Sequence, residues 1–121
     1  MERDLKIRTK LFSHDIITLL ESMDYSPIKR VIINQLLRSA TSVGANYRAA
    51  TRARSDREFI AKLRIVHEEA DECCYWLEII SERKWADVEK ELKEANELTA
   101  ILVTSLKTMY SKMITTKNES N

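Results

Sequence analysis

Apolar residues recur along this chain with the three- and four-residue spacing of amphipathic helices. The pattern predicts four helices, over residues 4–23, 27–52, 56–82 and 88–114. Each predicted helix carries one apolar stripe, and the stripes together form the predicted core. Their members are Leu5, Phe12, Ile16, Leu19 and Met23; Ile32, Leu36, Ala40, Val43, Tyr47 and Ala50; Phe59, Leu63, Val66, Ala70, Cys73, Leu77 and Ile80; and Val88, Leu92, Ala95, Leu102, Leu106, Met109 and Met113.

Residues at the predicted helix starts support these boundaries. Ser26 is the predicted N-cap of the second helix, and Pro27 suits its first position because proline lacks the N–H that this position leaves unused. Ser55 and Glu58 have the spacing of a capping box at the start of the third helix. Asp87 is the predicted N-cap of the fourth helix.

Long helices joined by short turns predict an all-α fold, an up-down-up-down antiparallel four-helix bundle. The composition agrees, because one glycine and one proline provide too few turn formers for a β-rich fold. Residues 1–116 are predicted to form this single domain, and residues 117–121 a polar, disordered tail. Gly44 lies inside the second helix, where it costs about 1 kcal/mol relative to alanine. We therefore expect a neighbouring helix to approach closely at this position.

Charge is unevenly distributed along the chain, although the net charge is only +1. Residues 29–64 contain nine lysines and arginines against two acidic residues, whereas residues 65–99 contain four against eleven. A basic block therefore precedes an acidic block, and the two can pair or can each meet a partner.

The basic block contains the candidate nucleic-acid site. Its residues are Arg30, Arg38, Arg48, Arg52, Arg54, Arg57 and Lys62. The first four lie along one face of the second helix, where guanidinium groups can make bidentate contacts with the phosphates of RNA or DNA. No base-reading motif accompanies them, so such binding should be salt-sensitive and independent of sequence. Alternatively, the arginines pair with acidic residues of the third helix, in the same or a neighbouring subunit. Those residues are Glu68, Glu69, Asp71, Glu72 and Glu78.

Three apolar residues of the third helix lie off its core stripe. Tyr75 and Ile79 fall about 160° from the stripe, and Trp76 about 100° from it. A cluster of exposed apolar groups is typical of an interface. These residues are therefore the predicted interface of a homo-oligomer.

The sequence lacks the motifs of enzymes and cofactor proteins. No phosphate-binding loop or nucleophile elbow occurs, and one glycine cannot build such loops. A di-metal site in a helical bundle needs glutamate three residues before histidine, and neither His14 nor His67 has one. We expect no catalytic residue, no metal, no cofactor and no small-molecule substrate.

Cys73 and Cys74 are adjacent in sequence, so on a helix their side chains point about 100° apart and cannot form an ordinary disulfide. They are predicted to be reduced thiols in or near the core. The charged N-terminus lacks the apolar region of a signal peptide, and no apolar run approaches the length of a membrane span. We therefore expect a cytoplasmic protein that does not enter a membrane.

Two sequence motifs carry a family resemblance. The run QLLRSATSVGANYRAA occupies residues 35–50; Arg54 with EFIAKL at 58–63, and EEADE and YWLE within 68–78, follow in order. They resemble the bacterial family of 23S rRNA-intervening sequence proteins. The resemblance implies a four-helix bundle that assembles as a ring-like homopentamer, with no known enzymatic activity. A more distant similarity is to the accessory protein of diversity-generating retroelements, which binds nucleic acid.

Together these features predict a non-enzymatic, homo-oligomeric bundle protein that binds RNA or DNA through its arginine-rich second helix. The alternative is a self-assembling scaffold whose basic and acidic faces pair within or between subunits.

Overall fold

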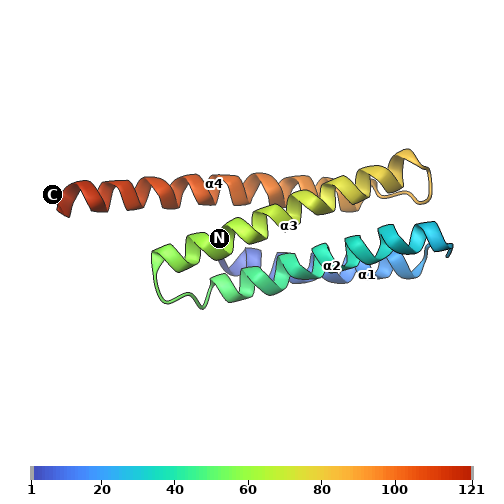
Figure 1. Cartoon of the computed structure of the whole chain (residues 1–121), viewed down its shortest axis with the longest axis horizontal. Coiled ribbons are helices and arrows are strands. Elements are labelled where there is room, and N and C mark those ends of the chain that lie inside the picture. The colour runs from blue at the N-terminus through green and yellow to red at the C-terminus, as the bar shows by residue number, and fades with distance from the viewer. Residues whose placement is uncertain (1, 121) are drawn as a thin grey trace.

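The computed structural model describes residues 2–120, and their side chains from residue 5 to residue 118. It contains helix α1 at Glu2–Glu21, α2 at Pro27–Ala50, α3 at Asp56–Glu82 and α4 at Glu89–Ser120. Successive helices run in opposite directions and pack side by side (Figure 1). The predicted all-α four-helix bundle is confirmed.

Two predicted caps, Ser26 and Ser55, explain where α2 and α3 begin, and the third lies one residue early. The Ser26 hydroxyl accepts a hydrogen bond from the Lys29 backbone N–H at 3.1 Å, with Pro27 in the first position of α2. The Ser55 hydroxyl accepts one from the N–H of Glu58, also at 3.1 Å. Asp87 accepts one from the N–H of Glu89, but the first backbone hydrogen bond of α4 runs from the Leu92 N–H to the Val88 carbonyl, so the N-cap is Val88, one residue after the predicted Asp87. Each cap satisfies an N–H that the helix itself leaves without a partner.

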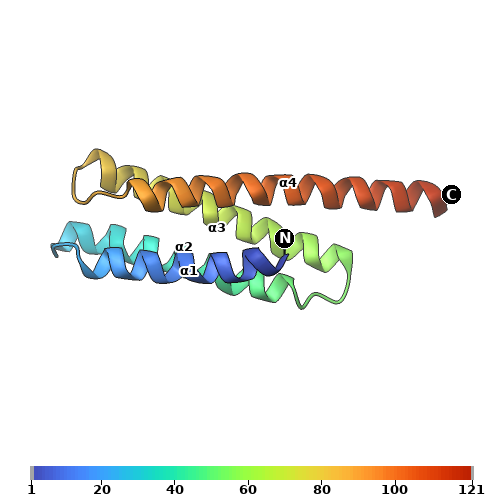
Figure 2. The same ribbon diagram turned by 180° about the vertical axis from the view of Figure 1, so that it is seen from behind.

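Helix α4 is longer than the sequence pattern indicates. It continues past the predicted end at Ile114 to Ser120, where a disordered tail was expected from residue 117. Its C-terminal end projects beyond the other three helices (Figure 2), and side chains 111–118 are all exposed. No glycine or proline interrupts this segment, so the backbone hydrogen bonds continue after the apolar stripe has ended. Residue 121 lies outside the described part of the chain.

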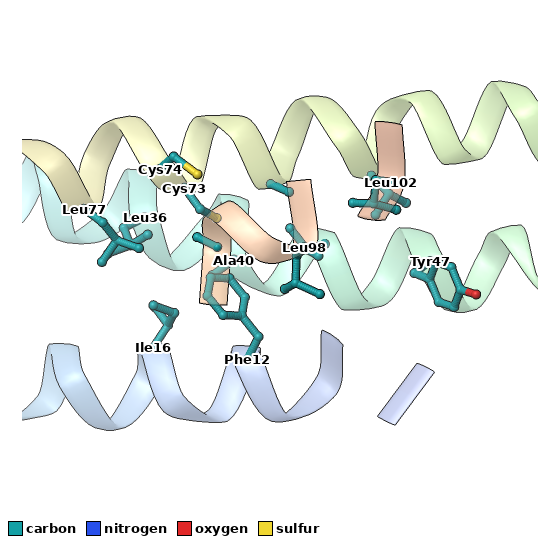
Figure 3. Close-up of a cluster of buried hydrophobic side chains, with 14 of the residues drawn as sticks. Phe12, Ile16, Leu36, Ala40, Tyr47, Cys73, Cys74, Leu77, Leu98 and Leu102 are labelled. Carbon is teal, nitrogen blue, oxygen red and sulfur yellow. The ribbon is translucent and has the colours of Figure 1, made fainter. Parts of the chain in front are cut away.

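The predicted stripes meet in one core along the bundle. Phe12 and Ile16 of α1, Leu36 of α2, and Leu98 and Leu102 of α4 point into it (Figure 3). Most predicted core residues are buried, while others are half-buried at the margins. Those at the margins are Met23, Ile32, Phe59, Leu92, Leu106 and Met109. Met113 was predicted to be in the core but is 37% exposed, because it lies at an open groove between the start of α3 and the end of α4.

Each helix packs against its neighbours around the bundle, but the four seams differ. Helix α1 packs closely on α2 and makes far fewer backbone approaches to α4. At Gly44, a Cβ atom would lie 3.3 Å from the Thr9 carbonyl oxygen and 3.4 Å from the Ser13 hydroxyl. The hydroxyl of Ser13 also donates to the Ala40 carbonyl at 3.2 Å. The close helix approach predicted at Gly44 is therefore confirmed.

Candidate nucleic-acid interface

Arg38, at the centre of the predicted arginine stripe, is bound to α3. Its Nη1 donates to Glu69 Oε2 at 2.9 Å, and its Nη2 donates to Glu72. The hydrogen bond with Glu72 is the main reason why the pKa of Arg38 is raised above its usual value. For this arginine the structure shows the alternative that the sequence left open, an ion pair within the subunit.

Arg48 lies in different surroundings, at a groove between α1 and α2 with a volume of about 490 Å³. Three full cations lie along this groove, Lys6 and Lys10 from α1 and Arg48 from α2. The remaining lining residues are Ser13, His14, Thr41, Gly44 and Ala45. No carboxylate lines the groove, so among the side chains of residues 5–118 nothing in its wall neutralises the cations. We refer to these eight lining residues as the cationic groove.

The helical repeat explains how the cationic groove forms. Lys6, Lys10 and His14 are four residues apart, which places them on one face of α1 at intervals of about 6 Å. Gly44 and Ala45 have little or no side chain, so the surface of α2 stays open beside this row. Between Pro27 and Ala50, helix α2 contains no acidic residue at all. Small residues therefore provide the space, and the sequence of α2 leaves it positive.

The other predicted binding residues do not converge on the cationic groove. Arg30 and Arg52 are exposed and have no ion pair with a carboxylate among residues 5–118. Arg54 is almost fully exposed, with its Nε 4.0 Å from Glu58, a separation at which an exposed pair contributes little. Lys62 is half-buried on α3. The predicted set is thus divided among several surfaces.

Lys6, Lys10 and His14 line the cationic groove but are not among the predicted binding residues. They lie outside the basic block of residues 29–64. The segment around Lys6 and Lys10 also contains acidic residues, so it does not stand out as basic in the sequence. The available signal was their four-residue spacing on the face of the first helix away from its core stripe.

Arg57 lines a second groove, between the start of α3 and the projecting end of α4, with a volume of about 430 Å³. Its cations are Arg57, Arg64 and Lys117, and its apolar residues are Ile60, Ala61, Tyr110, Met113 and Ile114. Ile114 is 61% exposed. This α3–α4 groove is therefore more apolar than the cationic groove, and its chemistry suits a protein surface better than a phosphate chain.

Some residues of the predicted oligomer interface already make contacts with other residues of the same subunit. The Trp76 indole N–H donates to Glu72 at 3.0 Å, and its ring contacts Tyr75 edge-on with centroids 5.0 Å apart. Ile79 is half-buried. Tyr75 remains 57% exposed, so it is the member of the set with most surface to offer a partner. Whether these residues form an interface stays a prediction.

The two cysteines are free and buried. Burial raises the pKa of the Cys73 thiol to about 12, and its sulfur lies 3.4 Å from the Ser39 hydroxyl as a hydrogen-bond donor. The pKa of Cys74 is raised as well, again mainly by burial. A thiol that stays protonated is a poor nucleophile, so neither cysteine resembles a reactive centre.

Two further searches concern metals and membranes. Among the side chains that the structure describes, no group of three histidine, cysteine or acidic residues is close enough to hold a metal ion. No helix within residues 2–120 combines the length and apolar character needed to cross a membrane.

This chain is similar to known proteins in both structure and sequence. The structure of a Bacteroides thetaiotaomicron protein of unknown function, from the S23 ribosomal protein family, superposes with a TM-score of 0.76. It is 31% identical in sequence, and the match covers 85% of this chain and 98% of that one. No curated protein sequence matches. The family described as 23S rRNA-intervening sequence protein matches residues 3–113, and the chain therefore belongs to that family.

Proposed function

We propose that this protein is a non-enzymatic binding protein that holds the phosphate backbone of RNA or DNA in the cationic groove. One observation carries the proposal: Lys6, Lys10 and Arg48 line a groove whose wall has no carboxylate among the side chains of residues 5–118. Arg38, by contrast, pairs with Glu69 within the subunit. Cations that are gathered without such partners repel one another, and a polyanion relieves that repulsion.

The groove chemistry favours the backbone over the bases. Arg48 can contact two phosphate oxygens at once, and the lysines act as mobile point charges. The neutral hydroxyls add no donors, because Ser13 already donates to backbone carbonyls and Thr41 donates to Leu37 O at 2.8 Å. No aromatic ring lines the groove, so bases find no stacking platform there. Binding should therefore be independent of sequence.

A binding experiment with charge-matched variants tests the proposal. A fluorescently labelled single-stranded oligonucleotide is titrated with the wild-type protein at 50 mM salt and followed by anisotropy. The variant Lys6→Ala/Lys10→Ala/Arg48→Ala should lose affinity about tenfold or more. The control Arg83→Ala/Lys93→Ala/Lys107→Ala removes the same charge from exposed positions outside the groove, and should retain most of the affinity. Equal losses in both variants, or no binding by the wild type, would contradict the proposal.

Self-assembly is the second candidate function, and a different observation favours it. The exposed side of α3 changes from basic to acidic along its length. Arg57 and Arg64 of the α3–α4 groove lie near its start, and acidic residues lie around Tyr75 towards its end. The exposed acidic residues are Glu68, Asp71 and Glu78. The basic, apolar α3–α4 groove of one copy is therefore complementary to the acidic surface around Tyr75 of a second copy. Such contacts join copies head to tail, and where the rotation between copies closes they form a ring such as the expected homopentamer.

Light scattering coupled to size exclusion tests self-assembly independently. The substitutions Ile114→Glu and Tyr75→Lys should each lower the measured mass, because each places a charge opposite a like charge or an apolar surface. Glu89→Lys, an exposed change away from both patches, is the control. A wild type that is monomeric at micromolar concentration would rule this candidate out.

A further inference from the structure

We infer that the cationic groove accepts a single strand of nucleic acid and excludes a duplex. This inference rests on the proposed function, because it specifies which form of nucleic acid the same groove takes. Two features carry it: the narrowness of the groove and the presence of cations on both of its walls.

The groove is narrow because its walls are two helices in close contact. Packed helices have axes about 8–10 Å apart, and the approach is so close at Gly44 that an added Cβ atom would lie 3.3 Å from the Thr9 carbonyl oxygen. The major groove of B-DNA alone is about 12 Å wide, so a duplex is too broad to enter between these helices. It can touch only the rims, whereas one sugar-phosphate chain fits a space of about 490 Å³.

The cations occupy both walls of this space. Lys6 and Lys10 project from α1, and Arg48 projects from α2. A phosphate on the floor of the groove is within reach of both walls, and it replaces the repulsion between them with attraction. A duplex resting on the rims leaves the floor empty and gains only part of this energy.

Lys6, Lys10 and His14 form a row along α1 that rises about 6 Å and turns about 40° around the helix at each step. A flexible single strand can follow the groove along its whole length. Its bases then face the solvent, since the lining has no aromatic side chain.

The test compares probes and fills the groove without changing its charge. Labelled oligothymidine of 12 nucleotides and a hairpin duplex with the same number of phosphates are titrated by anisotropy at 50 mM salt. Ala45→Leu fills the floor of the cationic groove, and Ala61→Leu makes the same change in the α3–α4 groove, where Ala61 is also exposed. Circular dichroism verifies that both variants remain folded.

We expect the wild type to bind the single strand at least tenfold more tightly than the duplex. Ala45→Leu should lose that preference and at least tenfold in single-strand affinity, while Ala61→Leu keeps both. Equal affinity for the two probes, or undiminished binding by Ala45→Leu, overturns the inference. If the Lys6/Lys10/Arg48 variant then loses both probes, the proposed function survives without it. If the wild type binds neither probe, both fail.

Discussion

Helix α1 has two flanks that carry similar cations in opposite circumstances. On the flank facing α4, Arg8 donates from Nε and Nη2 to Glu94, both at 2.7 Å, and lies 3.5 Å from Glu97. On the flank facing α2, Lys6 and Lys10 line a groove with no acidic side chain among those that the structure describes, residues 5–118. One helix thus presents matched charge on one side and unmatched charge on the other.

The packing explains the difference. The α1–α4 seam has few close backbone approaches, and ion pairs bridge it, including Lys90 with Asp15 at 3.9 Å. The α1–α2 seam is held by backbone proximity at Gly44 and by the Ser13 hydrogen bond to Ala40. Cations are therefore not needed for cohesion between α1 and α2. Their presence in the groove without acidic partners is easier to explain by binding than by folding.

The largest predicted effect comes from disrupting the close seam at Gly44. Gly44→Leu should destabilise the protein by about 1–3 kcal/mol, because the new side chain meets the α1 backbone, which cannot move aside as a side chain can. Ala45→Leu, one residue later, points into the open groove and should change the free energy of unfolding by no more than about 0.5 kcal/mol. Urea unfolding followed by circular dichroism measures both. Equal losses would mean that the close approach at Gly44 carries no stability.

The next largest predicted effect is that of salt, which should weaken nucleic-acid binding at the α1–α2 flank more than it weakens the ion pairs of the α1–α4 flank. With three phosphate contacts on a single strand, raising salt from 50 to 200 mM should weaken binding about twentyfold. The same change should lower the free energy of unfolding by less than about 1 kcal/mol, because the α1–α4 pairs are partly exposed and already screened. Anisotropy at four salt concentrations gives the slope. A slope of log affinity against log salt near zero would show that the protein does not contact the phosphates, and it would contradict the proposal.

The architecture could be predicted from the sequence because local signals determine it. Ser26 and Ser55 cap helices by contacts three residues away, and the apolar period alone identifies the buried side of each helix. The end of α4 could not be predicted, since beyond Ile114 the helix continues with neither a stripe nor a stop signal. Nor could the groove, because it joins Lys10 to Arg48 across two helices and depends on the close packing that Gly44 allows.

Removing one charge from each flank should produce a smaller contrast. Arg8→Ala leaves Glu94 without its bidentate partner and should cost up to about 1 kcal/mol of unfolding free energy, an amount that falls as salt rises. Lys10→Ala removes a cation with no ion pair among residues 5–118, so stability should be unchanged or slightly higher. Thermal unfolding at low and high salt measures this difference. A destabilised Lys10→Ala would show that the groove cation supports the fold after all.

The smallest predicted effect concerns Arg38, and it tests whether pairing with carboxylates prevents an arginine from contacting nucleic acid. Its guanidinium is bound by Glu69 and Glu72 and carries the raised pKa that this pairing produces. Arg38→Ala should therefore change affinity for a single strand by less than about twofold, whereas Arg48→Ala, on the same helix, should lower it several-fold. Anisotropy at 50 mM salt compares the two variants directly. If Arg38→Ala weakens binding as much as Arg48→Ala does, then carboxylate pairing does not withdraw an arginine from the binding surface. The whole arginine-rich face of α2, and not the cationic groove, would then contact the nucleic acid.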